Sequence, residues 1–211
     1  LKQLYNFKNK QISFPQTQDL QKALSSTGFG LIHLGKSNSV YLTRPFAQIS
    51  FASIGKGYAA DCVKQLWLEN GVKSGVINAS GDLCVIGKRP DRSLWKAGIP
   101  DPEKSGEMIL FIPVENAIAT SGDYEQFFFL NGKRYSHTIN PVSGYPVSGI
   151  KSVTVTGPSA ELCDALATAI TVMGVEVGLH FAGQLPGIHC LIIDADNKLH
   201  FTENITFEKN N

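Results

Sequence analysis

Residues 161–174, ELCDALATAITVMG, alternate apolar and polar positions with the period of an α-helix. The apolar positions form one stripe, made of Leu162, Leu166, Ala169, Ile170 and Met173. The other side carries Asp164, Thr168 and Thr171 among alanines, where Lys, Glu and Gln would stand on a solvated face. A lone carboxylate with a hydroxyl one turn away suits a hard cation or a phosphate oxygen. The pattern alone leaves open a helix packed on both sides, with Asp164 bonded to a neighbouring backbone.

Further helical spacing is present near 16–29, at 56–70 and at 175–183. In the helix at 56–70, the side chains predicted to be buried are Tyr58, Ala59, Val63, Leu66 and Trp67. The sequence Asn70-Gly71 is typical of a helix end.

Strand patterns outnumber the helical ones. They are predicted at 74–80, 83–87, 95–100, 107–114, 151–157, 188–195 and 199–203. Hairpins are predicted at 30–43 and at 124–139, the second around Asn131-Gly132, the sequence of a type I′ turn. Because strands outnumber helices and several of them form hairpins, the sequence indicates an α+β fold with mixed, largely antiparallel sheets and packed helices.

Composition narrows the functional classes. The 19 basic and 18 acidic residues nearly balance and form no basic run, so a nucleic-acid partner is not expected. No stretch is apolar enough to span a bilayer, and the first residues lack a signal-peptide pattern. The four cysteines show no metal-site spacing and are interpreted as structural thiols.

Four motifs carry candidate chemistry. ASIGKGYAAD at 52–61 places Lys56 and small residues at a helix start, which favours an anion site. NASGD at 78–82 and ATSGDYEQF at 119–127 are small, polar segments, interpreted as turns that let a ligand approach the backbone. YSHTINPVSGYP at 135–146 puts His137 at a strand end. Taken singly, each motif also has a plain explanation. The first fits a helix start with a solvated Lys, the second and third fit tight turns, and the fourth fits a structural His.

The order of these motifs, continued by VTVTGPSAELCDALATA, resembles the signature of the FAD:protein FMN transferases, the ApbE family. The resemblance covers about residues 45–203. It implies an ApbE/T-fold-like α+β fold and one transferase domain over 1–211, incomplete at its N-terminus. Relative to the family pattern, serines replace an Asp at Ser50 and glycines at Ser53 and Ser80, and Asn140 replaces an Asp.

The resemblance also implies a set of site residues. Mg²⁺ would be held by the Asp164 carboxylate, the Thr168 hydroxyl and the carbonyls of Ser53 and Ala167. The positions expected to contact FAD are Ser50, Lys56, Asn78, Ser121 and Thr138. His137 and Asp164 are the expected catalytic residues, either of which could accept the proton of the incoming hydroxyl.

The function implied is Mg²⁺-dependent transfer of FMN from FAD to a Thr or Ser hydroxyl of an acceptor protein, with release of AMP. The alternatives are an FAD pyrophosphatase, in which water replaces the acceptor, and a carrier that holds FAD without turnover. By the same resemblance the protein is expected at the bacterial cell envelope. Membrane association through a lipid anchor upstream of Leu1 is a further expectation.

Overall fold

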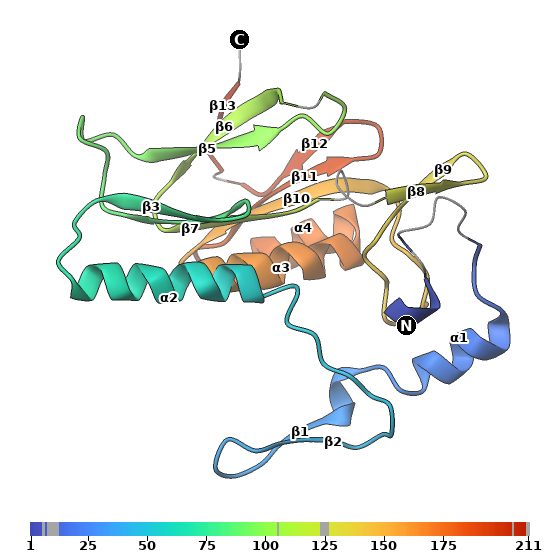
Figure 1. Cartoon of the computed structure of the whole chain (residues 1–211). Helices are drawn as coiled ribbons and strands as arrows, with labels where there is room; N and C mark the ends of the chain where they lie inside the picture. Colours follow the sequence, from blue (N-terminus) through green and yellow to red (C-terminus); the bar gives the residue numbers. More distant parts are fainter. Residues whose placement is uncertain (6, 8–12, 105, 123–126, 204, 210–211) are drawn as a thin grey trace. The chain divides into compact units, whose positions relative to one another are not determined.

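The computed structural model describes residues 1–5, 7, 13–104, 106–122, 127–203 and 205–209. These form two compact units, one of residues 1–50 with 125–148 and one of residues 51–124 with 149–211 (Figure 1). The second unit, here the sheet unit, holds most of the helical and strand structure. The first is here called the hairpin unit.

The sheet unit is built on a six-stranded antiparallel sheet with the order β12-β11-β10-β7-β4-β3. Its strands are β3 (Gly75–Ala79), β4 (Asp82–Ile86), β7 (Ala117–Gly122), β10 (Ile150–Gly157), β11 (His189–Asp194) and β12 (Leu199–Phe201). A second antiparallel sheet contains β5 (Trp95–Pro100), β6 (Met108–Val114) and β13 (Glu208–Lys209). The helices are α2 (Gly55–Glu69), α3 (Ala160–Met173) and α4 (Val175–Gly183). Each described pairing in the sheet unit is antiparallel, whereas the sequence predicted mixed, largely antiparallel sheets.

Apolar side chains on both faces of the large sheet form two cores, one on each face. On β4, Cys84 packs with the helix side, whereas its neighbour Val85 packs with the three-stranded sheet. The same split separates Ile192 from Leu191 and Ile193 on β11. Because successive side chains of a strand point to opposite faces, one sequence serves both layers. The helices therefore cover one face and β5, β6 and β13 the other (Figure 1).

Helix α3 occupies the predicted span, but its buried side differs from the predicted stripe. Cys163, Ala167 and Ile170 are fully buried, whereas Leu162 and Met173 are 39% and 37% exposed. The prediction of that stripe was therefore wrong at its two ends. The small side chains of Cys163 and Ala167 allow the helix to lie close to the sheet, whereas Leu162 and Met173 are partly exposed to solvent.

Helix α2 also has its predicted span and an unpredicted buried face. Gly57 and Ala60 are its buried residues, while Tyr58, Leu66 and Trp67 are 57%, 56% and 36% exposed. The remaining two side chains predicted to be buried, Ala59 and Val63, are exposed as well. The prediction was wrong because the contact with α3 selects the smallest residues rather than the most apolar ones.

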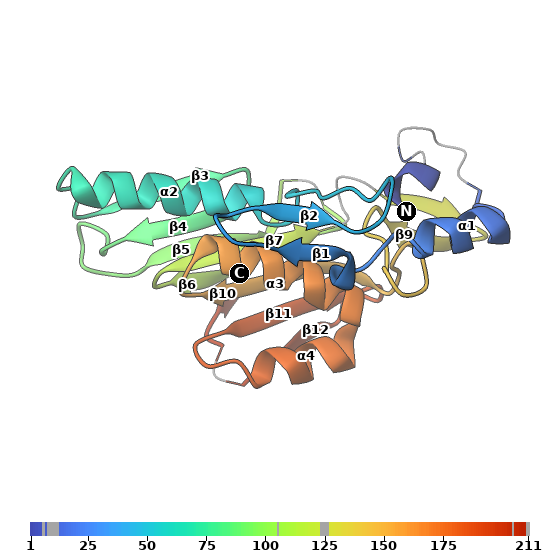
Figure 2. The same ribbon diagram turned by 90° about the horizontal axis from the view of Figure 1, so that it is seen from below.

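Helices α2 and α3 lie on the same side of the large sheet (Figure 2). Their close contact occurs at Gly57. A Cβ at this position would lie 2.3 Å from the carbonyl oxygen of Ala160, which belongs to the backbone of α3. Gly57→Ala is therefore expected to push the helices apart and to cost about 1–3 kcal/mol of unfolding free energy, the usual range for overpacking. Gly55→Ala is the matched control, since its added Cβ would meet nothing within 4 Å. Equal denaturant midpoints for the two variants would contradict this packing argument.

The hairpin unit contains α1 (Thr17–Leu24), the pair β1 (Ile32–Leu34) and β2 (Val40–Leu42), and the pair β8 (Phe127–Leu130) and β9 (Lys133–Ser136). Both predicted hairpins are confirmed, except that residues 124–126 lie outside the described part of the chain. Asn131 and Gly132 have φ values of 52° and 76°, as a type I′ turn requires. Stacked rings of Phe128 and Tyr135 join the two strands.

Three of the four cysteines lie in the sheet-unit core. Cys84, Cys163 and Cys190 are fully buried, and burial raises the pKa of their thiols to about 11, 12 and 12. These three fit the structural role predicted for them, while Cys62 is exposed on α2. Among the described residues, no helix has both the length and the apolar character needed to cross a bilayer.

Candidate functional site

The starts of α2 and α3 are joined by two carboxylates. The first amide groups of a helix have no partner inside it. In α2, the Gly57 amide donates to Oδ2 of Asp164 on α3, at 3.3 Å. In return, the carboxylate of Asp61 on α2 accepts hydrogen bonds from the Ala160 and Glu161 amides of α3, at 3.0 and 2.9 Å. Asp164 is thus a buried carboxylate at the positive end of α2, where a helix dipole stabilises negative charge.

A third carboxylate, Asp82, lies near Asp164 and was not predicted as a site residue from the sequence. It is the first residue of β4 and is completely buried, with its side chain on the same face as Cys84. Nζ of Lys56 lies 2.7 Å from its Oδ2. Within the described residues, no donor reaches its Oδ1.

Burial raises the pKa of Asp82 to about 6. Lys56 lowers this pKa by hydrogen bonding and by its charge, and the nearby negative charge of Asp164 raises it. Since the folded-state pKa lies above the ordinary 3.8, the ionised carboxylate opposes folding at neutral pH. This cost begins to fall as the pH drops below about 6, and it is gone below the ordinary value of 3.8. The fold therefore tolerates a destabilising charge here.

This chemistry fits a divalent cation. Two neighbouring carboxylates concentrate negative charge, and Oδ1 of Asp82 is a buried acceptor without a donor among the described residues. Hard cations prefer such oxygen ligands. In the described part of the chain no three His, Cys, Asp or Glu side chains form a metal cluster. A cation would therefore need hydroxyl or carbonyl oxygens in addition to Asp164.

The other predicted metal ligands lie on the same elements. Thr168 follows Asp164 by one turn of α3, so both belong to one side of the helix. The carbonyl of Ala167 accepts a hydrogen bond from the Thr171 hydroxyl at 2.8 Å. Ser53 lies in the turn that precedes α2. All four predicted ligands thus belong to the sheet unit.

Besides Lys56, two more of the predicted FAD contacts lie in the sheet unit, one at a turn and one in a strand. Oδ1 of Asn78 accepts a hydrogen bond from the Gly81 amide at 2.8 Å and so supports the β3–β4 turn. Ser121 lies inside β7, paired in register with Val153 of β10, and the turn predicted at its position is wrong. The small residues at 119–122, interpreted as a turn, instead continue β7, where they pair with β10 on the sheet face that α3 contacts.

The remaining predicted site residues belong to the hairpin unit. His137 directly follows β9 and is half-buried, which confirms its predicted place at a strand end. The Thr138 amide donates to Oγ of Ser136 at 3.1 Å, and its carbonyl accepts from the Val147 amide at 2.8 Å. On the other side, the Ser136 amide donates to the Val147 carbonyl at 2.8 Å, so the backbone is fixed on both sides of His137.

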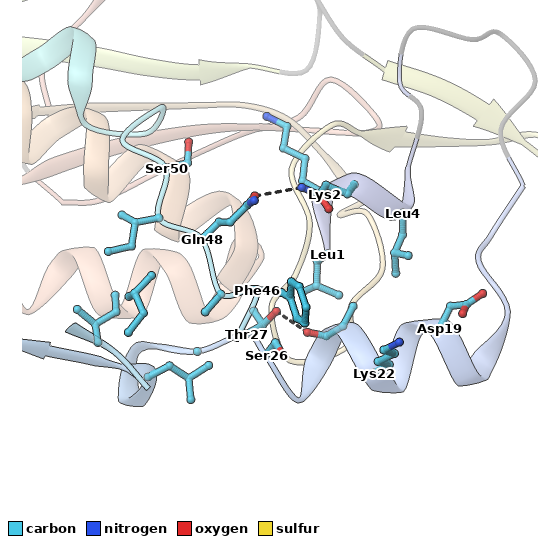
Figure 3. Close-up of a pocket in the computed structure, with 18 residues that line it drawn as sticks. Leu1, Lys2, Leu4, Asp19, Lys22, Ser26, Thr27, Phe46, Gln48 and Ser50 are labelled. Carbon is cyan, nitrogen blue, oxygen red and sulfur yellow. Dashed lines mark hydrogen bonds between the residues drawn. The ribbon is translucent and has the colours of Figure 1, made fainter. Parts of the chain in front are cut away.

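Ser50, the last predicted contact, lines a cavity of about 880 Å³ in the hairpin unit (Figure 3). Its wall includes the side chains of Lys22 and Phe46, and a hydrogen bond of 3.1 Å joins Gln3 to Gln48. Pockets for small ligands have volumes of this order. The hairpin unit thus contains a cavity, and the sheet unit contains the charged cluster.

Comparison with known proteins decides the family. The model of the ApbE family matches residues 1–192, most of the chain and both units. The chain belongs to the ApbE family. The resemblance inferred from the ordered motifs is confirmed, and so is the α+β fold.

Sequence relatives and solved ApbE structures support the same family assignment. An FAD:protein FMN transferase of Treponema pallidum is 30% identical over 96% of this chain and 60% of its own length. An ApbE protein from Thermotoga maritima has 32% identity and a TM-score of 0.82, over 94% of this chain and 64% of that protein. The apo form of the flavinyl transferase ApbE from Pseudomonas stutzeri has 30% identity and a TM-score of 0.79, over 95% and 63%. The chain thus spans about two thirds or less of these ApbE relatives.

Asp82 was missed although the sequence contains a signal for it. Ser80-Gly81 is a two-residue turn, so Asp82 must begin the next strand and share a face with Cys84, two residues later. An Asp on the apolar side of a strand is a buried charge that needs a partner. In this ApbE chain the partner is Lys56, from a motif considered separately.

Proposed function

We propose that the protein transfers FMN from FAD to a Thr or Ser hydroxyl of an acceptor protein in an Mg²⁺-dependent reaction that releases AMP. The observation that carries this proposal is the cluster of Lys56, Asp82 and Asp164 at the joined starts of α2 and α3. The names of the relatives support FAD as the donor and a protein as the acceptor. A pure FAD carrier would have no need to bury two carboxylates beside a lysine.

The proposed reaction is a phosphoryl transfer. The acceptor oxygen would attack the phosphorus atom on the FMN side of the FAD pyrophosphate, and the bond from that atom to the bridging oxygen would break. AMP leaves with the bridging oxygen, and the acceptor proton passes to a base. The Lys56 ammonium would offset charge on the phosphate oxygens.

Asp164, Thr168 and the carbonyls of Ser53 and Ala167 are the residues proposed to hold Mg²⁺. A bound Mg²⁺ would neutralise part of the negative charge on the pyrophosphate. The wall of the hairpin-unit cavity contains Ser50, which supports assigning this cavity to part of FAD. The cell-envelope location and the lipid anchor stay predictions from the family resemblance.

The test is incubation of the protein with FAD and Mg²⁺, with and without a peptide containing Thr or Ser, followed by mass spectrometry. The expected result is a peptide carrying one FMN and an equal amount of AMP. Free FMN and AMP at the same rate with and without peptide would identify a pyrophosphatase instead. Intact FAD in each reaction would identify a carrier. A chelator control should stop product formation.

A further inference from the structure

The position of Asp82 is fixed by the tight turn before it. Ser80 and Gly81 have φ values of 54° and 98°, the pair of positive values that a type I′ turn needs. Ala79 and Asp82 close the turn as paired residues, and Asn78 supports it with a side-chain hydrogen bond. The backbone under the Asp82 carboxylate therefore has little freedom.

The contact with Lys56 differs from a surface ion pair. The Asp82 side chain is 1% exposed, whereas that of Lys56 is 42% exposed. One partner is thus locked in the core, while the other extends from the second residue of α2 toward solvent. Exposed pairs gain little because two mobile side chains must be ordered, but here one end is already immobile. Asp82 therefore restrains the ammonium group.

We propose that Asp82 is a positioning residue that holds the Lys56 ammonium beside Asp164, aimed at the pyrophosphate of FAD. This rests on the proposed function, and it assigns Asp82 no contact with substrate. A purely structural carboxylate is already present in Asp61, whose two oxygens accept backbone amides at the start of α3. Asp82 accepts no such backbone hydrogen bond among the described residues. Its ionic partner there is a side chain that the reaction would use.

A double-mutant cycle on Asp82 and Lys56 tests the proposal. Asp82→Asn keeps the shape of the side chain and removes its charge, and Lys56→Met removes the ammonium. For Asp82→Asn alone we expect kcat for FMN transfer to fall about 10- to 100-fold, the scale of a small misplacement in an active site. KM for FAD should change less than about threefold, because the ammonium stays available to the phosphates. In the Lys56→Met background, Asp82→Asn should change kcat by less than about threefold.

A second measurement does not depend on catalysis. Chemical acylation of Lys56, followed by mass spectrometry, should be several times faster in Asp82→Asn than in the wild type because the ammonium is released. Asp61→Asn is the matched control. It should lower the unfolding temperature and leave Lys56 acylation unchanged, since within the described residues its carboxylate bonds only backbone amides.

The outcomes separate this proposal from the proposed function. Equal effects of Asp82→Asn with and without Lys56, or an unchanged rate of Lys56 acylation, would overturn the positioning role. Wild-type kcat in Asp82→Asn would overturn it as well. A wild-type protein that forms no FMN adduct and no AMP counts against the proposed function alone, and the acylation comparison still decides whether Asp82 holds Lys56.

Discussion

Asp164→Asn is expected to remove FMN transfer, with kcat lowered by at least about 10³-fold, and to weaken Mg²⁺ binding strongly. The variant loses the carboxylate charge on which a hard cation depends, yet it keeps an oxygen that can accept from the Gly57 amide. The fold should not lose stability, because Asp164 raises the pKa of Asp82 by its charge and that repulsion disappears. Calorimetric titration with Mg²⁺ and a thermal melt measure the two effects separately.

Thr168→Val serves as the graded control for Asp164→Asn. It removes one neutral oxygen from the same side of α3, so its effect on Mg²⁺ affinity should be smaller than that of the lost carboxylate. The metal assignment is wrong if Asp164→Asn keeps wild-type activity, or if a chelator leaves the wild-type rate unchanged. The ligands of any bound Mg²⁺ would then have to be sought among other residues.

His137→Ala is expected to bind FAD with nearly wild-type affinity and to transfer FMN about 10²- to 10⁴-fold more slowly, the usual contribution of a general base. The reason is that His137 stands directly after β9, where the backbone of Thr138 is fixed by Ser136 and Val147. The loss should appear in kcat rather than in KM. Timed, quenched reactions with the peptide acceptor measure the transfer rate, and titration with FAD measures the binding affinity.

Two further variants make the His137 result specific. His137→Gln retains hydrogen bonding without a basic nitrogen and should be as slow as the alanine variant. His33→Ala, at an exposed position of β1, should leave the rate unchanged. A fall in the wild-type rate on acidification does not identify the base, because the pKa of Asp82 is about 6. Transfer at the wild-type rate by His137→Ala would rule out His137 and leave Asp164 as the candidate.

The sequence predicted the elements better than the faces they bury. The period of α3 and the Asn131-Gly132 turn are local signals, and both are confirmed. The buried faces of α2 and α3 depend on how closely the helices approach, and the contact at Gly57 cannot be derived from periodicity. The large apolar side chains of α2 were expected inside for that reason, and they lie outside.

In the candidate site, too, the sequence predicted individual residues better than the contacts between them. Lys56 and Asp164 were selected from two separate motifs, and the structure brings both to one carboxylate cluster. Asp82, which connects them, belongs to a third motif that was interpreted as a turn approached by a ligand, with no role for the Asp82 carboxylate. Its role depends on contacts between residues far apart in the sequence, which a motif describes only when the fold is known. The catalytic role of His137 and the FAD contacts of Thr138 and Ser50 stay predictions.

The buried thiols make the opening of this site measurable. Cys163 precedes Asp164 on α3, and Cys84 follows Asp82 by two residues on β4, so each reports on one of the two carboxylates. A maleimide reagent should modify the exposed Cys62 first, and the other three only when the native state opens locally. Labelling rates at Cys84, Cys163 and Cys190 would then give the free energy of opening for each region of the sheet unit. If Mg²⁺ and FAD bind at the joined starts of α2 and α3, their addition should slow labelling of Cys163 more than that of Cys190, with no substitution needed.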